Sequence, residues 1–117
     1  MSAFYLIHAA QTLAAHVRRE ADLASQEWAS ASLEMHFDQR ASGYFGRVTR
    51  ADGSTTTWAP RSRLLLHVAQ RLRRQLPKGT ESIHLRLSHS RAEDCVLVAD
   101  RALTISIPSA AAAPTPA

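Results

Sequence analysis

The sequence of 117 residues is poor in several residue types, and each scarcity excludes a kind of structure or function. Cys95 is the only cysteine, so no disulfide can form within the chain, and a reducing, cytoplasmic setting is expected. No run of about 18 consecutive apolar residues occurs, so no membrane-spanning helix is expected. The first residues lack the basic region of a signal peptide. Lys78 is the only lysine, so arginine supplies nearly all of the positive charge.

The groups that usually signal catalysis or metal binding are also sparse. The glycines are isolated, so no phosphate-binding loop is expected. Cys95 lies in an apolar stretch typical of a buried, inert cysteine. Glu34 and Asp38 would lie about 13 Å apart along a strand, which is too wide for a paired-carboxylate site. No histidine has a second ligand at zinc-site spacing, although His36 and His84 occupy the polar faces of two strands. We therefore expect a protein without catalytic activity, metal or cofactor.

The composition favours one globular domain. Hydrophobic residues make up 45% of the chain and charged residues 21%, which is typical of a folded protein. We expect residues 1–107 to form a single domain. Residues 108–117 contain only proline, serine, alanine and threonine, so we expect a disordered tail there.

Two segments have helical periodicity. Residues 4–22 place one apolar residue in each turn, from Leu6 through Leu13 to Ala21. A second helix is predicted from Pro60, in its first turn, to Leu76. Its predicted apolar face holds Leu64, Leu65, Val68, Ala69, Leu72 and Leu76, and its opposite face holds Arg63, His67, Gln70, Arg71 and Arg74.

Six segments alternate between polar and apolar residues or are short and apolar, as strands are. They are residues 29–38, 44–50, 54–58, 83–88, 95–99 and 103–107. Turns are predicted at residues 39–43, with Gly43 adopting a positive φ, at Asp52-Gly53 and at Asp100-Arg101. The predicted fold class is α+β: an antiparallel sheet of about six strands, in the order α-β-β-β-α-β-β-β, with both helices on one face.

The charge distribution is uneven. Residues 60–91 contain eight of the fourteen basic residues and one acid, Glu81. A basic helix face of this kind fits a solvated surface, an acidic protein partner or nucleic acid. Arginine-rich nucleic-acid surfaces usually carry exposed aromatics, and the basic segment has none. The residues that we expect to contact a partner are Arg63, His67, Arg71, Arg74, Arg86, Tyr44 and Trp58.

The layout also resembles that of a known family. Glu27-Trp28 precedes the first strand, Gly43-Tyr44-Phe45-Gly46 lies in the second, and Ala51-Asp52-Gly53 forms the turn after it. A leucine-rich helix ending at Leu76 and the strand Ser82–Leu87 follow. Over most of residues 4–107 the chain resembles the YezG-like immunity proteins of bacterial polymorphic toxin systems. The resemblance implies a non-catalytic protein that neutralises a partner toxin by blocking or distorting its active site.

We therefore predict an immunity protein that binds one cognate protein, through its exposed sheet face or its basic helix. The positive charge favours an acidic toxin surface as the target. A nucleic-acid-binding module that uses residues 60–91 is the first alternative. A secretion chaperone or adaptor is the second, although such chaperones are usually acidic dimers. No membrane partner is expected.

Overall fold

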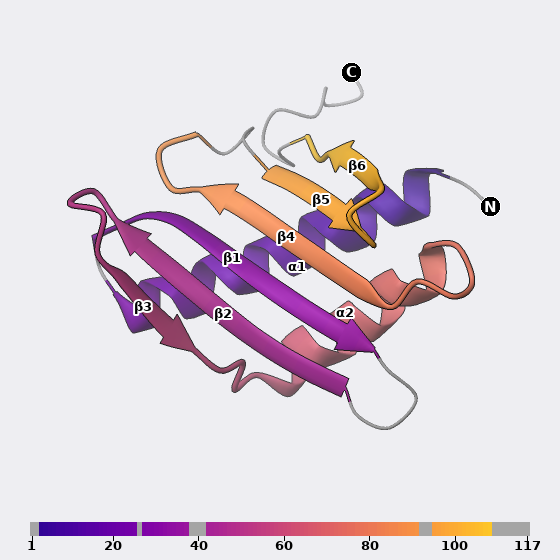
Figure 1. Cartoon of the computed structure of the whole chain (residues 1–117), viewed down its shortest axis with the longest axis horizontal. Helices are drawn as coiled ribbons and strands as arrows, with labels where there is room; N and C mark the ends of the chain where they lie inside the picture. The colour runs from indigo at the N-terminus through magenta and orange to yellow at the C-terminus, as the bar shows by residue number, and fades with distance from the viewer. Residues whose placement is uncertain (1–2, 26, 38–41, 92–94, 109–117) are drawn as a thin grey trace, which may run out of the picture.

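The computed structural model describes residues 3–25, 27–37, 42–91 and 95–108, and these form two helices and six strands in the predicted order (Figure 1). In the described part of the chain, no helix is long and apolar enough to cross a membrane. The predicted tail lies outside the described residues except for Pro108. The elements are α1 (Ala3–Ala24), β1 (Trp28–Phe37), β2 (Ser42–Arg50), β3 (Thr55–Trp58), α2 (Arg63–Gln75), β4 (Ser82–Ser88), β5 (Cys95–Ala99) and β6 (Leu103–Ser106).

All six strands belong to one antiparallel sheet in the order β3-β2-β1-β4-β5-β6. Each three-strand meander runs outward from the centre, where β1 and β4 pair. The connection between the meanders contains α2. Both helices pack behind the same face of the sheet, so no helix of the described residues covers the other face (Figure 1). The predicted fold class and layering are confirmed.

The core lies between the helices and the sheet. Along β1, Ala31, Leu33, Met35 and Phe37 are buried, and the residues between them are more accessible. The helices contribute Leu13 and Val17 from α1 and, from α2, Leu65, Val68, Ala69 and Leu72. Leu64 departs from the prediction, because 63% of its surface is exposed. Each helical residue turns about 100° from the one before it, and this places Leu64 off the stripe centred on Leu65 and Leu72.

The start of α2 differs from the prediction. Pro60 lies before the helix, and Ser62 is the N-cap, with its side-chain oxygen accepting a hydrogen bond from the Leu65 N–H at 3.3 Å. Glu20 of α1 adds a second cap. Its Oε1 accepts the backbone N–H groups of Arg61, at 3.0 Å, and Ser62, at 2.9 Å. One carboxylate oxygen therefore joins the two helices and satisfies donors at the start of α2.

Two of the predicted turns are present, and they differ in backbone conformation. Around Asp52-Gly53, the Gly53 N–H donates to the Arg50 carbonyl and the Arg50 N–H donates to the Ser54 carbonyl, each at 2.9 Å. With Gly53 at a φ of 89°, this is a three-residue hairpin loop whose last residue is left-handed. In the β5–β6 turn, Asp100 and Arg101 are both left-handed, with φ values of 51° and 60°. Of the predicted turn at residues 39–43, residues 39–41 lie outside the described residues, and the prediction is wrong at Gly43, which lies within β2 and lacks a positive φ.

Candidate functional site

The open face of the sheet gathers polar and charged side chains from its central strands. The register places Arg47 of β2 and Arg86 of β4 on either side of Ser32 of β1, in one row across the sheet. Neighbouring strands lie about 4.8 Å apart, so the two arginine Cα atoms are about 10 Å apart. Arginine side chains are long enough to reach a common point above Ser32 from that separation. We call Arg47, Ser32 and Arg86 the arginine row.

The sheet is hollowed at this place. A depression of about 290 Å³ is lined by residues of β1, β2 and β4. It offers guanidinium donors, hydroxyls that donate or accept, and one carboxylate. The lining residues are Ser30, Ala31, Ser32, Glu34, Arg47, Thr49, His84 and Arg86.

His84 forms one end of this depression, and its surroundings favour the neutral imidazole. Burial lowers the pKa of His84, and the positive charges of Arg86 and Arg47 lower it further, while Glu34 across the strand pair opposes them. Its Nε2 is buried and has no hydrogen-bond partner among the described residues. With His84 neutral, two arginines face one carboxylate, and the depression carries a net positive charge.

Aromatic rings adjoin the arginine row. Phe45 is 38% exposed and stacks on His36, with ring centroids 6.1 Å apart and an angle of 14° between the rings. His36 Nε2 also lies 3.6 Å from Glu34 Oε2. Because Phe45 and Arg47 are two residues apart on β2, they project from the same face. The open face therefore combines an exposed ring with a guanidinium group.

Comparison with protein-family models, curated proteins and solved structures gives no match to this chain. The resemblance to YezG-like immunity proteins therefore stays a prediction.

The residues predicted to contact a partner lie on both sides of the sheet, so they do not form one surface. Arg63, His67, Arg71 and Arg74 are exposed on α2, and Arg86 is exposed on the open face. Tyr44 and Trp58 project toward the helices. Tyr44 Oη accepts a hydrogen bond from Gln70 Nε2 at 2.6 Å, and burial raises the pKa of Tyr44.

Trp58 packs on the helix side of β2. Its indole ring lies against Gly46, the residue opposite it on β2, where no side chain stands in the way. Both Tyr44 and Trp58 thus have packing roles on the helix side. Adjacent strand residues project to opposite faces, so Phe45 projects from the open face while Tyr44 packs edge-on against Phe37 on the helix side.

Arg47 and Ser32 were not among the predicted site residues. Sequence alternation alone puts Arg47 on the same side of its strand as Phe45 and Thr49, which was the available signal. The β1–β2 and β1–β4 registers supply the rest, because they bring residues 32, 47 and 86 into line. Cys95 is buried as expected, and burial raises the pKa of its thiol to about 11.

Proposed function

We propose that this chain is a non-catalytic binding protein of the immunity type, which holds an acidic surface of a cognate protein against the open face of its sheet. The observation that carries the proposal is the arginine row: Arg47 and Arg86, from two different strands, both line the depression around Ser32. The basic face of α2, the other predicted surface, lies behind the sheet (Figure 1).

The charge on the open face favours a carboxylate-bearing partner. Glu34 is the only acidic side chain among the described strand residues that project from this face. Planar guanidinium groups bind carboxylates through two parallel hydrogen bonds, which gives direction as well as charge complementarity. An aspartate or glutamate side chain of the partner would therefore enter the depression between Arg47 and Arg86.

The same groups offer binding but no paired nucleophile and base. His84 Nε2 makes no hydrogen bond to any described residue, so no described hydroxyl is paired with it. The described residues contain no group of three or more His, Cys, Asp or Glu side chains placed to hold a metal ion. These observations are consistent with a surface that binds a partner.

Matched charge reversals test the proposed face. The Arg47→Glu/Arg86→Glu variant reverses the arginine row, and Arg71→Glu/Arg74→Glu makes the same change of charge on α2. A partner captured from nuclease-treated lysate by the wild-type chain is identified, purified and titrated against all three proteins. We expect the open-face variant to lose binding and the α2 variant to retain it. The reverse pattern would move the interface to α2, and equal binding by all three would refute both placements.

A second candidate function has one specific observation in its favour. Phe45, stacked on His36 beside Arg47, gives the open face the combination of exposed ring and arginine that single-stranded nucleic acids use. This moves the nucleic-acid alternative from α2 to the sheet. Fluorescence anisotropy with a labelled single-stranded oligonucleotide at rising salt tests it. Binding that falls steeply with salt and is lost in Phe45→Ala would favour this candidate over the protein partner.

A further inference from the structure

The outer edge of β3 carries unpaired backbone groups in a regular pattern. Arg50 and Ser54 form a hydrogen-bonded pair at the end of the β2–β3 ladder, since the Arg50 N–H donates to the Ser54 carbonyl. Hydrogen-bonded and non-bonded pairs alternate along an antiparallel ladder. Thr56 and Trp58 are therefore bonded to β2, while the N–H and C=O groups of Thr55 and Thr57 point outward from the sheet. Among the described residues, no strand lies beyond β3.

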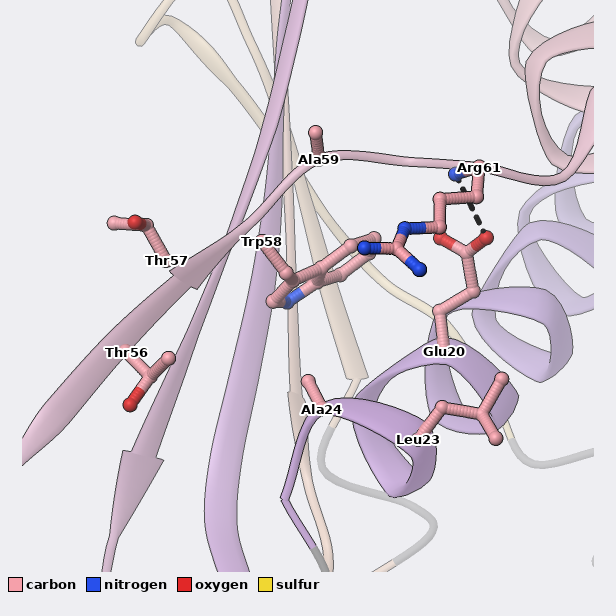
Figure 2. A pocket seen from close by; sticks show the side chains of 8 residues that line it. All are labelled: Glu20, Leu23, Ala24, Thr56, Thr57, Trp58, Ala59 and Arg61. Carbon is pink, nitrogen blue, oxygen red and sulfur yellow. Dashed lines mark hydrogen bonds between the residues drawn. The ribbon is translucent and has the colours of Figure 1, made fainter.

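A groove runs beside this edge on the helix side (Figure 2). It has a volume of about 430 Å³ and lies between β3 and the end of α1. Figure 2 shows Leu23 and Ala24 on the α1 side and the Trp58 ring reaching across toward Glu20 and Arg61. Leu23 is 83% exposed, which is the largest value among the exposed large hydrophobic side chains of the described residues. The exposed side chain of Leu23 thus lies next to the unpaired outer edge of β3.

We propose that a second copy of this chain pairs with β3 along this edge, antiparallel and about a two-fold axis that passes midway between the two copies of Thr56. The outward groups of Thr55 and Thr57 are placed symmetrically about Thr56, so Thr55 of each copy hydrogen-bonds with the partner's Thr57. Thr56 then lies opposite the partner's Thr56, in a non-bonded pair. The edge is self-complementary in this register.

The chemistry of the edge favours a second copy over a charged partner. β3 reads Thr-Thr-Thr-Trp and contains no charged residue or proline, which are two of the features that proteins use to prevent edge pairing. Threonine is a strong strand former, and threonine pairs across strands are favourable. With the axis perpendicular to the sheet, both α1 ends lie on the same side of the joined sheets. The two exposed Leu23 side chains then face each other across the paired strands and fill the grooves.

Proline substitutions test the pairing, with a matched control on the opposite edge. Thr57→Pro removes an N–H that points outward and leaves the ladder to β2 intact. Thr104→Pro on β6 is the control. Ile107 donates to Cys95 at 2.8 Å, and by the same alternation the Thr104 N–H points away from β5. Light scattering across a concentration series should show a wild-type dimer. We expect Thr57→Pro to weaken it about tenfold or more through the loss of one hydrogen bond per copy, and Thr104→Pro to leave it unchanged.

Cysteine substitutions test the register independently of proline's effect on folding. Opposite residues of a non-bonded pair have Cα atoms about 4.5 Å apart, within the range that a disulfide spans. Thr56→Cys should therefore give a disulfide-linked dimer under mild oxidation. Thr57→Cys, on the same strand, should not, because its partner across the axis is Thr55. The buried native thiol of Cys95 does not interfere. A wild-type chain that stays monomeric, a dimer broken by Thr104→Pro, or equal cross-linking of both cysteine variants would overturn the proposal.

Discussion

Gly46 offers the sharpest test of how the sheet edge is packed. It is buried on β2, directly opposite Trp58 on β3. A Cβ atom added at Gly46 would overlap the Cδ2, Cε2 and Cζ2 atoms of the Trp58 indole. Alanine and the indole ring cannot occupy this space together, so in Gly46→Ala the ring must leave the helix-side surface of β2.

The expected cost follows from how deeply Trp58 is buried. Truncating a fully buried tryptophan to alanine costs about 3–5 kcal/mol. Trp58 is half-buried, so losing its packing should cost about half as much, or roughly 2 kcal/mol. For a domain of this size the midpoint of thermal unfolding should fall by about 8 °C.

A double-mutant cycle separates this clash from any general effect of alanine at position 46. Urea unfolding followed by circular dichroism is measured for the wild type, Gly46→Ala, Trp58→Ala and the double variant. We expect Gly46→Ala to cost roughly 2 kcal/mol in the wild type and close to nothing in the Trp58→Ala background, because alanine suits a strand better than glycine. Equal costs in both backgrounds would refute the proposed contact.

Three further predictions concern single residues. Glu20→Ala should speed hydrogen exchange at the Arg61 and Ser62 amides and lower the unfolding free energy by about 1–2 kcal/mol. Glu20→Gln should keep much of the cap. Unchanged exchange in Glu20→Ala would contradict the capping role of Glu20. Asp100 accepts two backbone N–H groups, which lower its pKa. Its stabilisation should be complete above the ordinary aspartate pKa near 3.9 and disappear as the pH falls through the lower folded-state value. Asp100→Asn should reduce that acid dependence in urea titrations at several pH values. Cys95, buried with a pKa of about 11, should react with a thiol reagent only at the rate of unfolding, and fast labelling of the native protein would contradict its burial.

The order of elements could be predicted because it depends on local patterns. The two-residue alternation of β1 and the helical spacing from Leu6 to Ala21 each specify one element and the side that it buries. The predicted ends of helices and strands are less accurate where a residue distant in the sequence determines them. Glu20 lies 41 residues before Arg61 in the sequence, yet its carboxylate helps fix where α2 begins. No local pattern around Pro60 records that contact.

The arginine row could not be predicted for a similar reason. Alternation places Arg47 and Arg86 on the polar side of their own strands, but it does not say which residue of β1 lies between them. That depends on the pairing of β1 with β4, which are separated in sequence by two strands and a helix. A shift of two residues in either register would preserve the buried face and separate the arginines. The site is therefore a property of the register, which tertiary packing selects.

The two basic surfaces of the molecule must be judged separately because the sheet stands between them. Arg71 and Arg74 project from the helix layer, whereas Arg47 and Arg86 project from the opposite side of the sheet. A compact partner can contact only one of these surfaces at a time. The total charge of +4, which first suggested an acidic partner, therefore does not identify the interface. Both basic surfaces are hollowed: on the open face Arg47 and Arg86 line one depression, where a single carboxylate could meet two guanidinium groups, and behind the sheet Arg73, Arg74 and Lys78 line another of about 390 Å³. The matched charge reversals at Arg47/Arg86 and at Arg71/Arg74 therefore decide between the two surfaces.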